Sequence, residues 1–220
     1  SISHDLRTPL TSISGSAGIL LNSASALGEE KQKQLYKGIY DDSMWLINLV
    51  ENLLSITRME AGSIPVKQEL VDLSALIEGQ LALDAELLRQ REQRLVSALT
   101  PGITVTGDTL LLGKAVGNLL SNASLHSPEG ARIRVWCGRL GEAPAFSVEN
   151  TGAHIREEAL AHLFEAFYRE ESSRSRSMGG SGLGLYLAQI IFKRHGARCM
   201  IENTDDGVKA TVLFECQPPV

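Results

Sequence analysis

The sequence opens with a histidine next to an aspartate, His4 and Asp5, in the segment SISHDLRTPL. A neutral imidazole has a free lone pair and an ordinary pKa of about 6.5, so it can act as a nucleophile near neutral pH. A neighbouring carboxylate can orient such a ring and accept its other proton. Thr8 follows one helical turn after His4, and Pro9 removes a backbone donor and bends a helix. Taken alone, a His–Asp pair is more often two solvated side chains, so the pattern needs support from the rest of the chain.

Two asparagines, Asn118 and Asn122, are separated by four residues in the segment NLLSN. On a helix this spacing places both amides on one face. Amide oxygens are hard ligands that can hold Mg²⁺ while phosphates and water complete its octahedral coordination. A plain polar helix face is the alternative interpretation of the same pattern.

A glycine-rich segment, GGSGLGL at residues 179–185, leads into the apolar helical stretch Tyr186–Phe192. Glycine has no Cβ, so the backbone can approach a phosphate closely, and a helix N-terminus attracts anions. The segment lacks the Lys of a P-loop, and no dinucleotide-type strand and acidic residue accompany it. A simple tight turn remains the alternative.

Two shorter segments complete the candidate chemistry. In VENTG, residues 148–152, a strand is expected to end at a polar residue, and the Asn150 oxygen can accept a hydrogen bond from an adenine amino group. In LFEAFYRE, residues 163–170, we expect Phe164 and Phe167 to pack and to anchor the polar stretch that follows. That stretch, EESSRSRSMGG, is expected to be a mobile loop.

Residues 1–60 show apolar positions at alternating spacings of three and four, which predicts two helices. The predicted seams are Ile2, Leu6, Pro9, Ile13, Ser16 and Leu20, then Ile39, Ser43, Leu46, Val50, Leu53 and Thr57, widened by Leu10, Leu21, Ile47 and Leu54. The Ser- and Ala-rich segment Asn22–Gly28 suits the turn between them. Two short helices bury one face each, so we expect dimerisation into a four-helix bundle. The alternative is a helical hairpin docked on the rest of the chain.

After Gly62 the pattern changes to a mixture of strands and helices. Strands are expected at residues 64–70, 133–137, 145–148, 198–201 and 208–214, the last two as a hairpin, and helices at 73–89, 109–125 and 183–195. This order predicts an α+β fold in which helices cover one face of a sheet.

Composition excludes several functional classes. The 220 residues carry 21 Lys and Arg against 26 Asp and Glu, a net charge of −5, which argues against nucleic-acid binding. No stretch approaches the roughly 20 apolar residues of a membrane span, so membrane contact is expected only through N-terminal segments outside this sequence. The dispersed cysteines, Cys137, Cys199 and Cys216, favour reduced thiols in a cytosolic compartment. The absence of an initial Met and the start close to His4 suggest a fragment of a longer protein.

In their order, the five segments resemble the motifs of the cytoplasmic core of a sensor histidine kinase. SHDLRTPL resembles the phosphoacceptor box, NLLSNA the N box, VENTG the first Gly box, LFEAFYR the F box and GGSGLGL the second Gly box. The resemblance covers essentially the whole chain. It implies a dimerisation and histidine phosphotransfer domain at residues 1–61 and a catalytic ATP-binding domain at 66–220, an α/β sandwich of the Bergerat type under a flexible lid. The stretches ISHDLRTPLTSISG and IYDDSMWLINLVENLL are most similar to potassium-responsive Kdp-type kinases.

The resemblance also implies a role for each site residue. His4 would be the phosphorylated nucleophile, Asp5 would orient its ring, and Thr8 would position water for dephosphorylation of the partner. ATP would be bound by residues of the later motifs, namely Asn118, Asn122, Asn150, Gly152, Arg169, Gly180, Gly182, Leu183 and Gly184, with Asn122 as the Mg²⁺ ligand. The chain would form a homodimer that autophosphorylates His4 and passes the phosphoryl group to an aspartate of a response-regulator receiver domain. Its setting would be the cytoplasmic portion of a membrane-anchored bacterial sensor.

Three residues depart from the family pattern. Asn150 stands where the first Gly box usually has Asp, and it loses the charge assistance of a carboxylate. His154 replaces a Gly and adds bulk near the expected nucleotide. Leu125 replaces the Lys of the N box, a charge that Arg169 or the loop residues Arg174 and Arg176 would have to supply.

These departures leave two alternatives open. One is a degenerate kinase that acts as a dimeric scaffold or as a phosphatase only. The other is a chaperone-type or gyrase-type ATPase of the same superfamily. Such enzymes use a glutamate base beside the first Asn, whereas Lys114 lies one turn before Asn118 here, and they lack the His-bearing helices.

Overall fold

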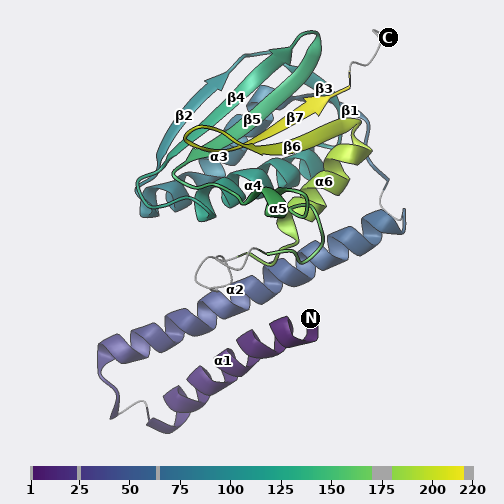
Figure 1. Ribbon diagram of the computed structural model, residues 1–220. Coiled ribbons are helices and arrows are strands. Elements are labelled where there is room, and N and C mark those ends of the chain that lie inside the picture. Colours follow the sequence, from purple (N-terminus) through teal and green to yellow (C-terminus); the bar gives the residue numbers. More distant parts are fainter. Residues whose placement is uncertain (1, 24–25, 63–64, 170–179, 216–220) are drawn as a thin grey trace. The chain divides into compact units, whose positions relative to one another are not determined.

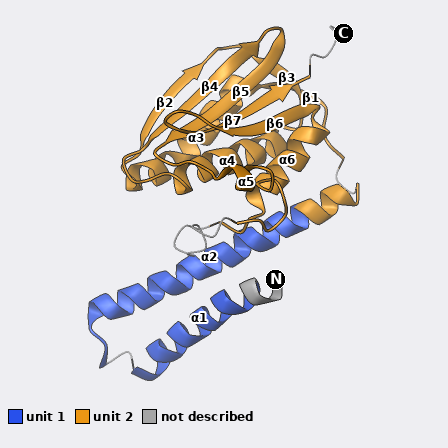
Figure 2. Ribbon diagram, in the orientation of Figure 1, with its two compact units in different colours: residues 1–55 blue, residues 56–220 orange. Residues whose placement is uncertain are grey.

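The computed structural model describes residues 2–23, 26–62, 65–169 and 180–215, with the backbone alone for residues 2–5 (Figure 1). The chain divides into two compact units, residues 1–55 and residues 56–220 (Figure 2). Each unit is described by itself below. Among the described residues, no helix is long and apolar enough to cross a membrane.

The first unit contains helix α1, Ile2–Ser23, and most of helix α2, Glu29–Glu60. The two helices predicted from the apolar spacing are therefore confirmed. Pro9 lies inside α1 without ending it. Helix α2 begins with Glu29 and Glu30 and has Arg58 in its last turn, an order of charges that complements the helix dipole.

The predicted seams of these helices are buried only in part. On α1, Pro9 and Leu20 are buried and Leu6 and Ile13 are half-buried, as expected. On α2, Leu49 is buried instead of the predicted Val50, which is 48% exposed. Several other large apolar side chains of the pair are exposed, namely Leu10, Ile19, Leu21, Tyr36, Tyr40, Met44, Ile47 and Leu54. An apolar surface of this extent remains for a partner to cover.

The second unit is built on a five-stranded sheet in the order β2-β4-β5-β7-β6. These strands are β2 at Arg94–Leu99, β4 at Arg132–Leu140, β5 at Ala143–Thr151, β6 at Ala197–Asn203 and β7 at Gly207–Phe214. The pair β2–β4 is parallel and the others are antiparallel. A second, two-stranded sheet pairs β1, Glu69–Asp72, with β3, Thr104–Gly107.

Helices cover one face of the large sheet, as predicted (Figure 1). They are α3 at Leu73–Gln90, α4 at Thr109–Leu125 and α6 at Gly184–Arg194, with a short helix α5 at Glu157–Leu160. Asp72 and Asp108 are the N-cap residues of α3 and α4. The Asp72 carboxylate accepts one hydrogen bond from a first-turn N–H group and the Asp108 carboxylate accepts two. In the core, Phe146 of β5 contacts Phe192 of α6, with ring centroids 5.9 Å apart.

Parts of the predicted secondary structure are wrong or incomplete. The strand expected at 64–70 is found at 69–72, and residues 65–68 are not in a strand. Strands β2 and β3 and helix α5 were not predicted. The residues of β2 are exposed apart from the half-buried Leu99, so no alternation of buried positions marks this strand.

The last turn of α2 belongs to the second unit. Met59 is 1% exposed, and its carbonyl accepts a hydrogen bond from the Arg194 guanidinium at 2.5 Å. The Tyr186 hydroxyl donates to the Glu60 carboxylate at 2.7 Å, and this bond raises the pKa of the phenol. The two compact units therefore meet between residues 55 and 56. The functional domains predicted from the sequence, residues 1–61 and 66–220, stay a prediction.

Candidate functional site

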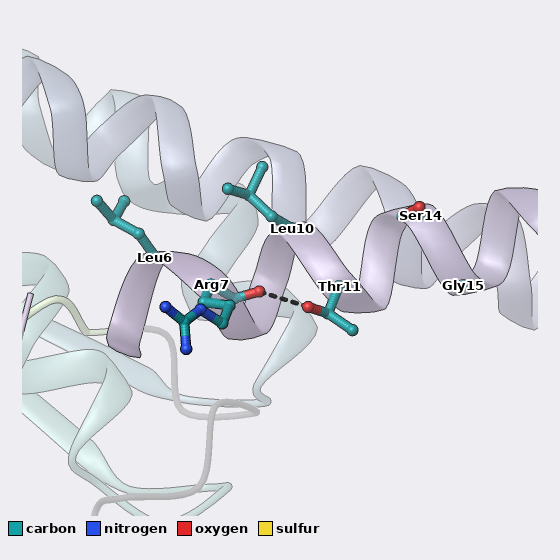
Figure 3. Close-up of a pocket in the computed structure, with 6 residues that line it drawn as sticks. All are labelled: Leu6, Arg7, Leu10, Thr11, Ser14 and Gly15. Carbon is teal, nitrogen blue, oxygen red and sulfur yellow. Dashed lines mark hydrogen bonds between the residues drawn. The ribbon is translucent and has the colours of Figure 1, made fainter. Parts of the chain in front are cut away.

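The phosphoacceptor segment lies in the first turns of α1. The side chains of His4 and Asp5 lie outside the described residues, and Thr8, one turn later, is half-buried. The following two turns line an open groove with Leu6, Arg7, Leu10, Thr11, Ser14 and Gly15 (Figure 3). Leu6 and Leu10 point to the same side of the helix there, while Thr11 donates a hydrogen bond to the Arg7 carbonyl at 2.8 Å.

The two asparagines of α4 lie on one helix, as the spacing predicted, and both are half-buried. The Asn118 Nδ2 donates to the Gly184 carbonyl at 3.1 Å, so this amide ties α4 to the first residue of α6. The Asn122 side chain forms no hydrogen bond within the described part of the chain. Asn122 is therefore available to a ligand, and its oxygen fits the hard-donor chemistry that Mg²⁺ prefers.

Asn150 lies near the end of β5 and is 5% exposed. Because strand residues alternate in direction, Asn150 shares the helix-covered face with Phe146, four residues earlier. Its side-chain amide has no hydrogen-bond partner among the described residues. The polar atoms of the amide are not fully buried, so they are accessible to a ligand group that can complete their hydrogen bonds.

The corner beyond Asn150 is closed by glycines and a proline. Gly152 has φ +85°, its N–H donates to the Asp206 carbonyl at 2.8 Å, and a Cβ there would lie 2.7 Å from Pro128 Cγ. A Cβ on Gly207 would lie 1.8 Å from the Asn150 carbonyl oxygen. Gly207 and Pro128 were not singled out from the sequence, although SPEG and DDG are recognisable turn segments.

The unusual His154 is exposed, and its Nε2 lies 2.9 Å from the Thr204 carbonyl oxygen. Thr204 belongs to the connection between β6 and β7, and the neighbouring Asn203 side chain exchanges two hydrogen bonds with the backbone of Ile155. The imidazole is thus held against this connection. Its bulk is directed to the β6–β7 turn.

The F box and the second Gly box meet through their backbones. Phe167 has φ +67°, and its N–H donates to the Gly182 carbonyl at 2.9 Å. Gly182 has φ +71°, and a Cβ there would lie 2.9 Å from Phe167 C and Tyr168 O. The predicted mobile loop, with Arg174 and Arg176, lies outside the described residues, and Arg169 is the last described residue before it.

Helix α6 begins without a side-chain cap. Leu183, the residue at the cap position, is 1% exposed, and its own N–H donates to Ser181 Oγ at 3.4 Å. The first turn has no acidic residue, whereas α3 and α4 are capped by Asp72 and Asp108. The first-turn N–H groups and the positive end of the helix dipole therefore remain available to an anion.

Helix α4 connects these elements into one site. Asn118 contacts Gly184 at the start of α6, and Pro128, just beyond the end of α4, packs on Gly152. Between them Asn122 lies one turn, about 6 Å, after Asn118. The result is an open helix N-terminus, two amides on a neighbouring helix and a buried amide at a strand end, an arrangement suited to a phosphorylated ligand with a polar ring.

Comparison with protein families agrees with this geometry. Residues 107–219 match the family described as histidine kinase-, DNA gyrase B-, and HSP90-like ATPase, and residues 1–62 match the His Kinase A (phospho-acceptor) domain. The chain belongs to the sensor histidine kinases. The resemblance inferred from the five sequence motifs is thus confirmed at the level of the family.

Curated relatives of this histidine kinase include the sensor protein KdpD of Clostridium acetobutylicum. It is 32% identical over 207 residues, which are 94% of the chain and 23% of KdpD. The histidine-protein kinase/phosphatase MprB of Mycolicibacterium vanbaalenii is 34% identical over 209 residues, 93% of the chain and 42% of MprB. The chain thus spans less than half of either relative.

Among solved structures, the kinase resembles ThkA in a crystal structure with the response regulator protein TrrA. The TM-score is 0.73 at 21% identity, with 97% of this chain and 59% of that chain covered. At this identity the likeness shows the fold alone. It confirms the predicted helical hairpin followed by an α/β sandwich.

Proposed function

We propose that this chain is the catalytic core of a sensor kinase that uses ATP to phosphorylate His4 and then passes the phosphoryl group to an aspartate of a receiver domain. One observation carries the proposal: a phosphoacceptor domain at residues 1–62 and an ATPase domain at 107–219 occur in one chain. A histidine that accepts phosphate and a site that supplies it are the two parts that autophosphorylation needs.

In the proposed reaction a neutral His4 nitrogen attacks the γ-phosphorus of ATP. A nitrogen–phosphorus bond forms, the bond to the β,γ-bridging oxygen breaks, and ADP leaves. The attacking ring becomes positively charged, with its proton on the other nitrogen. The Asp5 carboxylate would hold that proton and stabilise the charge.

The nucleotide would be held by three groups of this chain. The Asn150 oxygen would accept from the adenine amino group, and the uncapped first turn of α6 would bind phosphate oxygens. Asn122 would ligate Mg²⁺, which offsets phosphate charge when it is bound. The described residues contain no cluster of three or more His, Cys, Asp or Glu for a metal, so the amide and the nucleotide would supply the ligands.

Partners and dephosphorylation form the second part of the proposal. Exposed apolar side chains on α1 and α2 support a homodimer that completes a four-helix bundle. The complex of ThkA with TrrA supports a response-regulator receiver as the acceptor. The similarity to MprB, a kinase/phosphatase, supports dephosphorylation of that regulator, with Thr8 positioning the water.

A Kdp-type sensor is the finer proposal for this kinase. The similarity to KdpD and the two helical stretches named above support it. Because the chain spans 23% of KdpD, the segments that sense a signal and anchor the protein to a membrane would lie in the remainder of a longer protein.

Transfer from ATP is tested with two labels. The purified chain is incubated with Mg²⁺ and ATP labelled at either the γ- or the α-phosphate, then denatured and washed. Retention of the γ-label alone is expected, because only the γ-phosphoryl group forms a covalent bond to the protein. Retention of neither label, in protein shown to be folded, would contradict the proposed kinase activity.

A degenerate kinase, acting as a scaffold or a phosphatase, is the second candidate. The neutral Asn150 in place of a carboxylate and Leu125 in place of a cation favour it. Calorimetric titration with ATP separates the two candidates. Absence of binding at millimolar ATP would favour the degenerate protein.

A further inference from the structure

Helices α4 and α6 are joined by a polar contact at each end of their packed length. At one end Asn118 Nδ2 donates to the Gly184 carbonyl at 3.1 Å. At the other end the N–H of Asp108, the N-cap residue of α4, donates to Nε2 of His195, the C-cap residue of α6, at 3.0 Å. The two contacts bracket ten residues of α4 and eleven of α6, or about 15 Å of antiparallel helix.

The His195 ring is held in one tautomer. Asp108 N can only donate, so Nε2 must carry the lone pair. Nδ1 lies 2.7 Å from the Ile191 carbonyl oxygen, which can only accept, so Nδ1 must carry the proton. The residue is 8% exposed, and each ring nitrogen is used in a buried hydrogen bond.

The ring also has a fixed place. A Cβ on Gly107, the last residue of β3, would lie 2.4 Å from His195 Cδ2 and 3.1 Å from its Nε2. The imidazole therefore lies against the backbone of the corner between β3 and α4, in space that only a glycine leaves open. The Asp108 carboxylate, meanwhile, caps α4 through the N–H groups of Leu110 and Leu111.

Between the two contacts the helices pack through apolar side chains. The buried ones are Leu112, Ala115, Val116 and Leu119 on α4 and Leu187, Ala188, Ile191 and Phe192 on α6. Apolar burial depends on area and has little directional preference, whereas a hydrogen bond weakens steeply with distance and angle. The polar contacts at the two ends therefore add directional constraints on the axial register of α6 on α4 to the constraint from side-chain packing.

We propose that His195 is a positioning residue of the nucleotide site. It fixes the register of α6 on α4 from the end remote from the ligand, and so sets where the open first turn of α6 lies relative to Asn118 and Asn122. Because an eleven-residue helix moves as a rigid element, an axial slip at His195 displaces Gly184 by a similar distance. The proposal rests on the ATP site proposed above.

Two substitutions of His195 test the hydrogen bonds of its two ring nitrogens separately. His195→Gln places an amide oxygen where Nε2 was, so the bond from Asp108 N–H between the helices can persist. His195→Asn reaches only the Nδ1 position, so it keeps the contact with Ile191 and loses the one to α4. Ile77→Val, at a fully buried position of α3, provides a control that lowers stability without touching either contact.

The full chain and its three variants are compared for Mg²⁺–ATP affinity by titration. His195→Asn is expected to weaken binding about fivefold, the value of one net hydrogen bond, while His195→Gln and Ile77→Val stay within about twofold. A purely structural role predicts affinities unchanged in all three, with losses only in thermal stability. That result, or equal weakening in Gln and Asn, would overturn the proposal.

The register of α6 on α4 can be measured by NMR in the absence of nucleotide. In ¹⁵N-labelled protein the Asn118 side-chain amide and the Gly184 N–H resonances should move in His195→Asn and stay close to the parent in His195→Gln. Unmoved resonances in His195→Asn would overturn the positioning role even if ATP binds. Failure of the parent to bind ATP would instead refute the nucleotide site, and the resonances would still decide the register.

Discussion

The backbone N–H of Phe167 donates to the carbonyl of Gly182 at 2.9 Å, across the sequence gap that separates the F box from the second Gly box. Both residues have positive φ, +67° and +71°. The F box and the second Gly box are thus joined beside the first turn of α6. Any ligand at that helix N-terminus is bound next to this junction.

Gly182→Ala tests the junction. An added Cβ at residue 182 would lie 2.9 Å from backbone atoms, and alanine disfavours the positive φ of this residue. We therefore expect the unfolding free energy to fall by about 1–3 kcal/mol and ATP binding to weaken. Gly102→Ala is the matched control, since Gly102 also has a positive φ, +75°, but nothing lies within 4 Å of its added Cβ and it is not among the predicted nucleotide-binding residues. Thermal unfolding and ATP titration of both variants measure the effects. Equal behaviour of the two variants would contradict the role of the junction.

Asn122→Ala tests the proposed Mg²⁺ ligand. Loss of the amide oxygen should weaken ATP binding with Mg²⁺ more than binding in excess chelator. Asn118→Ala is the comparison, because its bond to Gly184 is made within the protein and should matter with and without the metal. The four titrations decide the point, and equal losses for Asn122→Ala in both conditions would show that Asn122 contacts no metal.

Asn150→Asp tests the adenine contact. A charge-assisted hydrogen bond exceeds a neutral one by roughly 1–1.5 kcal/mol, so ATP should bind up to about tenfold more tightly if desolvation of the carboxylate does not cancel the gain. Selectivity for ATP over GTP should exist in the parent and persist in the variant. Calorimetry with both nucleotides measures it, and equal affinity for ATP and GTP would refute the assignment of Asn150.

Cys199 should be unreactive in the folded protein. Burial raises the pKa of its thiol to about 12, so only about one molecule in ten thousand carries the thiolate at pH 8. Alkylation by iodoacetamide at that pH should label Cys199 much more slowly than an exposed cysteine, because the smaller thiolate fraction outweighs the higher nucleophilicity of that thiolate. Peptide mass spectrometry with and without denaturant gives the rates. Rapid native labelling of Cys199 would contradict the raised pKa of its thiol.

The sequence predicted where several candidate site residues lie, because their placement depends on local spacing. Asn118 and Asn122 share a helix and the Gly-rich segment opens α6, and both follow from short-range patterns. Contacts between residues far apart in the sequence could not be predicted from local patterns. His195 lies 87 residues from Asp108, and Gly207 approaches Asn150 only because β5 and β7 pair, so neither contact has a local signature.

The misses in the fold have the same origin. Strand β2 has no alternating burial, and β1 is short and starts five residues later than expected. On α2 the sequence placed Val50 on the buried seam, but an apolar stripe this wide allows the neighbouring Leu49 to be buried instead. The sequence predicted that the His154 side chain adds bulk near the nucleotide, but its ring lies against the Thr204 carbonyl, a contact that only the tertiary structure reveals.

The central claim is that His4 accepts the γ-phosphoryl group of ATP, and it is tested most directly by the chemical stability of the label. The chain and its His4→Gln variant are incubated with Mg²⁺ and γ-labelled ATP, and the denatured products are treated with acid or base. A phosphorus–nitrogen bond hydrolyses once its nitrogen is protonated, so the label should be lost in acid and survive base. The variant should carry no label while binding ATP as the parent does. Full, base-labile labelling of His4→Gln would contradict the account.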